Sequence, residues 1–266
     1  MSSLAAYIEG IGLLGPGLDG WTGSVALLEG RAAYVAQTTV LPAPDGLPPA
    51  ERRRTGRVVK LALGVGLQAT SRAGIDPASL PAVFSSSGGD GHNCHEICQT
   101  LSSGDRQISP TRFHNSVHNA AAGYWSIATG AKTAANALCA FDASFAAGLL
   151  EAVTQVTVDG TRVLLVSYDA QYPPPLHEKR PIPDAFGVAF VLAPSASGTA
   201  LARLAVAFSD SPATRMSNPA LEPLRASIPA ARSLPLLQQL ALRSPGTVNI
   251  EYLDGRSLAV ELAPCA

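Results

Sequence analysis

The chain has 266 residues, of which 47% are hydrophobic and 15% charged, and its formal net charge is −1. This composition allows one large domain with a substantial core and does not suggest disorder, while the near-zero charge speaks against a nucleic-acid-binding surface. The longest apolar runs, such as residues 185–192, are too short to span a bilayer, and no basic region precedes the first apolar residues. We therefore expect a cytoplasmic protein without nucleic acid or a membrane as partner.

The four cysteines, Cys94, Cys98, Cys139 and Cys265, lack the spacing of a secreted disulfide framework. We expect them to be reduced thiols.

The first third of the chain alternates strand and helix patterns. Glycines at positions 10, 12, 15 and 17 are expected to bend the exit of the first strand, but they do not form the Gly-x-Gly-x-x-Gly pattern of a dinucleotide site. An amphipathic helix at residues 57–73 should end at Gly74. The other expected elements are a strand at 5–13, a short helix at 25–29, a Pro-rich loop at 36–50 and a buried strand with its Gly exit at 82–89.

Potential metal ligands are concentrated between residues 92 and 98. The segment contains His92, Cys94, His95 and Cys98, and the two cysteines would share one helical face. One short segment is poorly suited to closing a tetrahedron, and no second group of ligands follows. A helix with its apolar side buried is the favoured interpretation, and a metal-binding module is the alternative.

Residues 104–151 are the most informative stretch. Ser109-Pro110 ends a loop, and a helix at 116–129 follows, with a bare Ala-Ala-Ala-Gly run at 120–123 that another element could approach closely. Gly130 ends this helix, residues 136–141 suit a buried strand, and Asp142 begins a helix that runs to Val158.

The rest of the chain reads as strands, loops and one further helix. The expected elements are strands at 162–168, 187–192 and 201–208, a Pro-rich loop at 171–183, an irregular segment at 212–229, a helix at 233–244 and a hairpin at 248–262 turning at Asp254-Gly255.

This order of motifs resembles the N-terminal half of the β-ketoacyl synthases, the thiolase-fold condensing enzymes of fatty-acid and polyketide synthesis. The matching residues are Ile108-Ser109-Pro110, Asn119, Ala122-Gly123 and Gly130. The resemblance covers roughly residues 5–208. It implies an α/β, thiolase-like fold with a mixed five-stranded sheet packed by helices in residues 1–208, and a C-terminal extension, residues 209–266, whose helix and β-hairpin pack on the same domain.

The family's nucleophilic cysteine is missing at the expected position. Asp142, followed by Ala143-Ser144, stands there, and a carboxylate cannot form a thioester. Helix capping is the favoured role of Asp142, and Cys139 is expected to be a small buried hydrophobe within the strand. The alternative is a displaced nucleophile: Cys139, with His114 or His118 as base, in a small acyl-transfer or hydrolytic enzyme.

The family's two activating histidines are also missing, because no histidine follows His177. The resemblance therefore implies a chain-length factor, a non-catalytic partner of an active ketosynthase. The segment from Phe113 to Trp125 resembles components of aryl polyene-type and related type II polyketide systems. The implied partners are an active ketosynthase in a heterodimer and an acyl carrier protein with its phosphopantetheine-bound acyl chain, and no cofactor is implied.

The resemblance also assigns residues to surfaces. In such pairs, the helical segments on both sides of Ser109-Pro110 cross the interface and close the partner's acyl tunnel. The expected tunnel and interface residues are Ile97, Leu101, Arg112, Phe113, His114, Val117, His118 and Asn119. His114 and His118, four apart on one expected helix, are expected to be buried and hydrogen-bonded at an interface rather than to bind a metal. Arg52, Arg53 and Arg54 form either a solvated helix entry or a carrier-protein docking patch.

Overall fold

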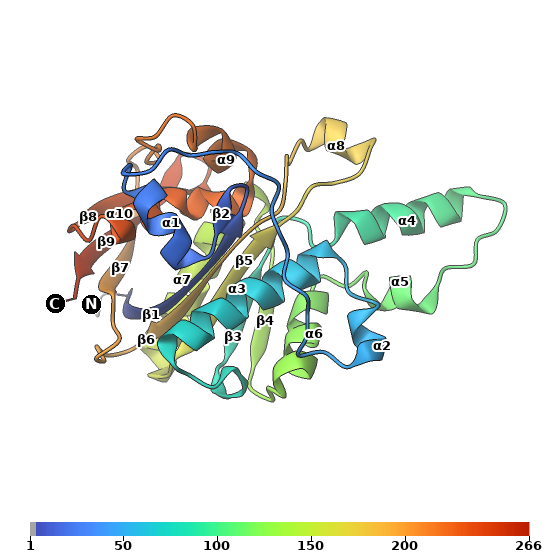
Figure 1. Ribbon diagram of the computed structural model, residues 1–266, viewed down its shortest axis with the longest axis horizontal. Helices are drawn as coiled ribbons and strands as arrows, with labels where there is room; N and C mark the ends of the chain where they lie inside the picture. The colour runs from blue at the N-terminus through green and yellow to red at the C-terminus, as the bar shows by residue number, and fades with distance from the viewer. Residues whose placement is uncertain (1–3, 266) are drawn as a thin grey trace.

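One large mixed sheet organises the computed structural model, which describes residues 4–265 (Figure 1). The strands are β1 (Leu4–Gly15), β2 (Leu18–Asp19), β3 (Ala82–Ser85), β4 (Ala135–Leu138), β5 (Val163–Asp169), β6 (Phe186–Ala193), β7 (Ala202–Ser209), β8 (Gly246–Leu253) and β9 (Arg256–Pro264). Their order across the sheet is β4-β3-β5-β6-β1-β7-β9-β8, and β2 pairs with β1.

Helices and 3₁₀ turns connect these strands. The helices are α1 (Trp21–Leu28), α2 (Pro49–Arg52), α3 (Arg57–Ala73), α4 (Gly91–Ser102), α5 (Pro110–His114), α6 (Ala120–Thr129), α7 (Ser144–Asp159), α8 (Leu176–Lys179), α9 (Glu222–Ser227) and α10 (Leu234–Ala241). The 3₁₀ turns are η1 (Pro77–Ser79), η2 (Phe141–Ala143) and η3 (Pro229–Ser233). No helix in this described part of the chain is long and apolar enough to cross a membrane.

The expected five-stranded mixed unit is present as β4-β3-β5-β6-β1. Strand β3 runs parallel to β4 and β5, whereas β6 runs antiparallel to both of its neighbours, β5 and β1. Alternating side chains of β5 enter two separate cores, as the two-residue period of a strand requires. Leu164 and Val166 pack with α3 and α6 on one face, while Val163 and Leu165 pack with α7 on the other. The α/β fold class is therefore confirmed.

The remaining strands continue the same sheet. Strand β7 pairs with the first half of β1, and the predicted hairpin, β8 and β9, pairs with β7 through β9. Gly255 in the hairpin turn has φ 70°, a value that glycine adopts without strain. Leu204, from before residue 208, and Leu237 and Val248, from after it, share one core. The division of the chain at residue 208 stays a prediction.

Helix α3 lies directly on β1, and two glycines allow this. A Cβ atom on Gly12 would lie 1.9 Å from the Val65 carbonyl oxygen, and one on Gly10 would lie 2.1 Å from that of Ala69. Both glycines lie within β1, so they serve close helix packing rather than the bend at the strand's exit that we expected. The helix itself spans the predicted residues and ends at Gly74 in the left-handed conformation.

Candidate functional site

The turn that would carry the nucleophile lies between β4 and α7. After β4 the chain passes through η2, where Phe141 has φ 51°, a region that a bulky residue adopts only under strain. The Ser144 hydroxyl closes the turn: it donates to the Phe141 carbonyl oxygen at 2.7 Å and accepts from the Ala140 N–H at 3.1 Å. Phe141 itself is 62% exposed in this turn.

Asp142 binds two arginines and does not cap α7, so its predicted capping role is wrong. Its Oδ1 accepts from Arg180 Nη2 at 2.5 Å, and its Oδ2 accepts from Arg232 Nη2 at 3.0 Å. Arg180 follows α8 and also lies over the Phe141 ring at 3.8 Å, while Arg232 belongs to η3. The carboxylate therefore faces two guanidinium groups from distant parts of the chain rather than the first N–H groups of the helix.

Cys139 is exposed, contrary to the expected buried position, because β4 is an edge strand whose own residues are exposed or half-buried. Its thiol donates to the Ser87 carbonyl oxygen at 3.1 Å. His118 lies near the adjacent carbonyl, with Nε2 3.3 Å from the Ser86 oxygen. Within residues 4–265 no hydrogen bond connects Cys139 to a histidine.

The two expected histidines do not share a helix. His114 is the last residue of α5 and is exposed in the chain by itself, whereas His118 lies half-buried in the connection to α6, so burial of His114 at an interface stays a prediction. His114 packs edge-on against Tyr124 with ring centroids 6.2 Å apart. The helix predicted from residue 116 begins at Ala120, and a Cβ atom added to Gly123 in its bare run would have no neighbour within 4 Å among residues 4–265.

A buried carboxylate that sequence reasoning missed holds the surroundings of this turn together. Asp169 ends β5 and is only 2% exposed. Its Oδ1 accepts from the Ser87 N–H at 2.9 Å and the Ser87 hydroxyl at 2.6 Å, and its Oδ2 accepts from the Ala230 N–H at 2.9 Å. Burial raises the pKa of Asp169 to about 6, although these hydrogen bonds and the Arg180 charge oppose the shift.

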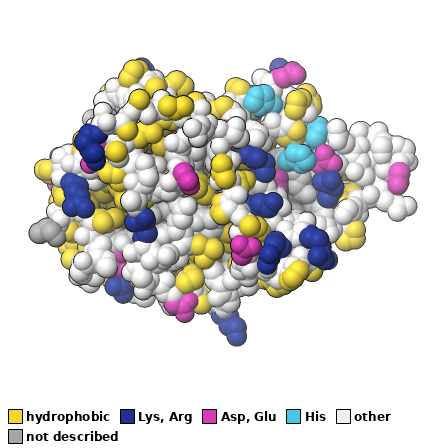
Figure 2. Space-filling model, in the orientation of Figure 1, with side chains coloured by type: hydrophobic (Ala, Val, Ile, Leu, Met, Phe, Trp, Pro, Cys, Tyr) yellow, Lys and Arg dark blue, Asp and Glu magenta, His cyan; other side chains and the backbone are white. Residues whose placement is uncertain are grey.

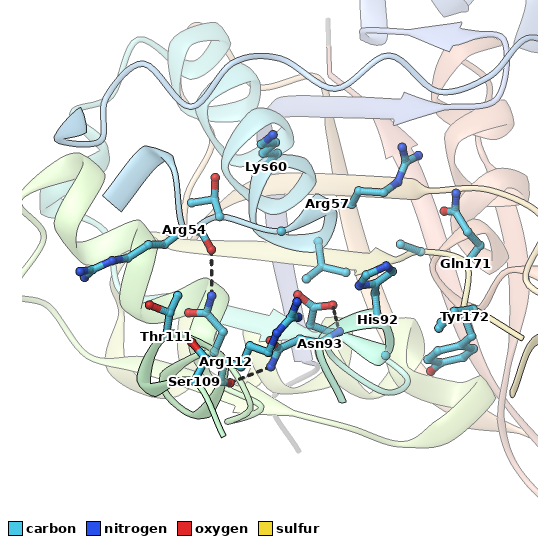
Figure 3. A pocket seen from close by; sticks show the side chains of 18 of the residues that line it. Arg54, Arg57, Lys60, His92, Asn93, Ser109, Thr111, Arg112, Gln171 and Tyr172 are labelled. Carbon is cyan, nitrogen blue, oxygen red and sulfur yellow. Dashed lines mark hydrogen bonds between the residues drawn. The ribbon is translucent and has the colours of Figure 1, made fainter. Parts of the chain in front are cut away.

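A basic cleft of about 730 Å³ opens beside this network (Figure 3). The start of α3, with Arg57 and Lys60, forms one side, and the segments with His92, Asn93 and Arg112 form the opposite side. We call it the cationic cleft, and its basic side chains are Arg53, Arg54, Arg57, Lys60 and Arg112.

The cleft contains only part of the predicted arginine patch. Arg53 and Arg54 line it, while Arg52 turns away to pair with Asp45 at 3.2 Å. Three of its cations have carboxylate partners: Arg54 with Glu51, Arg57 with Asp184 and Arg112 with Glu96. Arg53 and Lys60 have no ion-pair partner in the part of the chain that the structure describes.

Helices α4 and α5 project from the body as an arm, residues 91–114 (Figure 1). Only Gly91 and Asn93 of α4 are buried, so the prediction of a buried apolar side on this helix is wrong. Leu101, Phe113 and Val117, on the arm or just after it, are exposed large hydrophobics, whereas Ile97 is half-buried. Asn119, also exposed, follows at the start of α6.

The arm carries the four potential metal ligands of the sequence. Cys94 and Cys98 are both exposed on α4. Partial desolvation of the Cys94 thiol and the neighbouring Cys98 together raise the pKa of Cys94. No group of three or more His, Cys, Asp or Glu side chains within residues 4–265 is arranged to hold a metal ion.

Comparison with known families identifies the class to which this fold belongs. A model of the β-ketoacyl synthase N-terminal domain matches residues 29–244, and the chain therefore belongs to the β-ketoacyl synthase family. The match overlaps most of the motif resemblance and continues past residue 208. A search of curated protein sequences found no match.

Solved structures share the fold at low sequence identity. A ketosynthase, ApeO, in complex with its chain length factor, ApeC, from Xenorhabdus doucetiae matches with a TM-score of 0.73 and 22% identity, covering 97% of this chain and 99% of that chain. The ishigamide ketosynthase/chain length factor matches with a TM-score of 0.72 and 14% identity over 98% and 100%. The type II polyketide complex AntDE:AntF, an acyl-carrier protein with its ketosynthase, matches with 0.77 and 9% over 99% and 100%.

The raised pKa of Asp169 predicts a pH dependence of stability. Because the folded-state pKa of about 6 exceeds the unfolded value of 3.8, this carboxyl favours the folded state most below pH 4, and its contribution falls as the pH rises to 6. The change corresponds to roughly 3 kcal/mol. The unfolding free energy of Asp169→Asn relative to the unmodified chain should therefore increase between pH 4 and 7, as measured by urea denaturation. Asp159→Asn, which removes an exposed carboxylate, is the control. A difference that does not vary with pH would contradict the assignment.

Proposed function

We propose that this chain is a non-catalytic ketosynthase-like subunit that pairs with an active β-ketoacyl synthase and closes its acyl tunnel, in the manner of a chain length factor. The observation that carries the non-catalytic role is the pairing of Asp142 with Arg180 and Arg232. A carboxylate cannot serve as the thiolate nucleophile of a condensing enzyme, and two guanidinium groups occupy the space in front of it. The sequence after His177 also offers no histidine to stabilise a carbanion or oxyanion.

The arm supports a role as partner subunit. It presents exposed apolar side chains that no other part of the described chain covers, including Leu101 at 47% exposure and Phe113 at 69%. Exposed large hydrophobics on one projecting segment are candidates for a protein interaction site. Bulky side chains on this surface would fill the far end of the partner's acyl tunnel. They would limit how far a growing acyl chain can extend, because a filled tunnel leaves no room for further carbons.

The β4 edge of the sheet supports the same role. Strand β4 pairs with β3 on one side only and leaves its other edge of backbone N–H and C=O groups open. Open strand edges readily pair with another chain. Val117, Ile127 and Phe141, all exposed, come from the segments between the arm and α7 that flank β4 in sequence. We propose that the arm and the β4 edge together form the interface with the ketosynthase.

The cationic cleft suits an acyl carrier protein, which is the second partner that we propose. Carrier proteins present an acidic helix and a phosphate-bearing arm, both of which favour positive charge. Two relatives in fold are described as ketosynthase/chain length factor pairs, and a third as a ketosynthase complexed with its carrier protein. Such a system, for example one that makes aryl polyenes, would place this chain in the cytoplasm.

The interface is tested by co-expressing the chain with a full-length ketosynthase from the same source. A stoichiometric heterodimer is expected in size-exclusion chromatography with mass analysis. Phe113→Asp should weaken it by on the order of 2 kcal/mol, roughly thirtyfold in dissociation constant, because a charge would enter an apolar contact. Phe208→Asp, on the exposed end of β7, is the matched control and should leave it intact. A stable monomer that does not bind the ketosynthase would refute the proposed pairing.

The non-catalytic role is tested by incubating the chain with an acyl thioester and measuring intact mass. Only slow acylation is expected, at similar rates on exposed thiols such as Cys139 and Cys98, because within residues 4–265 neither thiol is hydrogen-bonded to a histidine. Cys139→Ser and Cys98→Ser should therefore each remove a comparable share of adduct. Rapid labelling abolished by Cys139→Ser alone would instead establish the acyl-transfer alternative.

Carrier-protein docking is tested by reversing the two unpaired charges of the cleft. The double variant Arg53→Glu, Lys60→Glu should bind the carrier protein roughly tenfold more weakly, with a smaller dependence on salt, because both cations lose their attraction for an acidic surface. The control Lys132→Glu, Arg256→Glu makes the same change in net charge outside the cleft. Equal weakening by both variants would show that only the overall charge matters, against a defined docking site.

A further inference from the structure

A second cavity, of about 700 Å³, lies apart from the cationic cleft and shares no lining residue with it. Its wall is formed by α1, the bulge in β1, the last turn of α3, the β6–β7 connection and the end of α10. Trp21, Val25, Leu201 and Leu240 give it apolar surface. This volume lies in the range of small-molecule sites, which combine apolar walls with a few polar groups.

The charges of this cavity do not balance. Glu9 accepts from Arg162 Nε at 2.7 Å, and Glu29 pairs with Arg31, so both acidic side chains of the lining are already neutralised. Burial acts to raise the pKa of Glu9, but hydrogen bonds to Arg162 and Ser197 and the Arg162 charge outweigh it and hold that pKa below its usual value. Arg72 and Arg243 also line the cavity, and neither has an ion-pair partner within residues 4–265. Two solvent-exposed guanidinium groups of the lining thus have no carboxylate partner among residues 4–265 and are available to bind an anion.

Arg243 has an unusual backbone conformation. Its φ is 48°, in the left-handed region just after α10, where a side chain is strained and glycine is favoured. Helices α3, α6 and α7 end at glycines in this same conformation, namely Gly74, Gly130 and Gly160. The chain therefore uses an arginine at this helix end, where the side chain lines the cavity, at a cost in stability. Strain that is kept in this way points to a function for the side chain.

We propose that this cavity binds an amphipathic organic anion, with its charged group between Arg72 and Arg243 and its apolar part against Trp21, Val25 and Leu240. Guanidinium groups form paired hydrogen bonds with a carboxylate or a phosphate, so the two arginines define the charge of the ligand but not its acid group. The apolar wall provides for a hydrocarbon chain or a ring. The site is independent of the proposed partner surfaces, which lie on the arm, β4 and the cationic cleft.

The ligand class is tested with five probes, of which the dodecyl anions are used below their critical micelle concentrations. Isothermal titration calorimetry should detect binding of dodecanoate and of dodecyl phosphate, binding of dodecanol at least tenfold weaker, and no binding of acetate. The ratio of the first two affinities identifies the preferred acid group. A 12-bromododecanoate titration should quench the fluorescence of Trp21, which lines the cavity, and Trp21→Phe should remove the quenching, because the remaining Trp125 is buried elsewhere. Dodecanol binding as tightly as dodecanoate, or no binding by either dodecyl anion, would overturn the proposal.

The two arginines are tested by substitutions that separate binding from folding. Arg243→Gly should raise the melting temperature by about 2–4 °C, because glycine relieves the strained φ, and should weaken dodecanoate binding at least tenfold. Arg72→Ala should weaken binding similarly without that rise. Arg256→Ala, an exposed arginine outside the cavity, is the control for the lost charge. Unchanged affinity in both Arg243→Gly and Arg72→Ala would overturn the proposal even if the stability change is as expected.

Discussion

The buried carboxylate of Asp169 ties together the segments from which the arm and the turn before α7 are built. Asp169 is the last residue of strand β5. It accepts two hydrogen bonds from Ser87, which follows β3, and one from Ala230 in η3. The loop after β3 leads into α4 and the arm, and η3 carries Arg232, one of the two partners of Asp142. One charged group, buried at some expense in stability, therefore fixes the origin of the arm and the electrostatics of the turn before α7.

Under the proposed non-catalytic role, the arrangement around Asp142 shows how a ketosynthase fold could be kept without a thiolate at the turn before α7. The strand, turn and helix that position a nucleophile in the family are present, and the strained φ of Phe141 shows that the turn keeps an unusual backbone. What differs is the charge: a carboxylate with two guanidinium partners replaces a reactive thiol. The turn has become a structural contact, because an ion pair that is partly shielded from water holds η2, α8 and η3 together.

Much of the fold could be predicted from local patterns. Helix α3 has the period of an amphipathic helix and a glycine stop, and the hairpin turns at Asp254-Gly255, so both were placed correctly from neighbouring residues alone. The order of the motifs also predicted a mixed sheet. The same patterns could not show that β4 lies at an edge of the sheet or that α4 projects from the body. An apolar residue gives the same sequence pattern whether it packs within its own chain or against another chain. The predictions that Cys139 and the apolar side of α4 would be buried are errors of this kind.

Long-range contacts of the candidate sites were likewise beyond local reasoning. Arg180 and Arg232 lie 38 and 90 positions from Asp142, and no spacing rule joins them. The run of arginines at 52–54 suggested a basic patch, yet Arg57, Lys60 and Arg112 complete it only after folding, and Arg52 faces Asp45 instead.

The ion pairs of Asp142 also have an evolutionary consequence. Replacing this residue alone by cysteine would leave Arg180 and Arg232 without their carboxylate partner. Removing either arginine first would leave Asp142 with one partner fewer and weaken the link between η2 and α8 or η3. Under the proposed non-catalytic role, regaining a nucleophile at this position would therefore require coordinated changes at three positions that are distant in the sequence, and the change to aspartate would be hard to reverse.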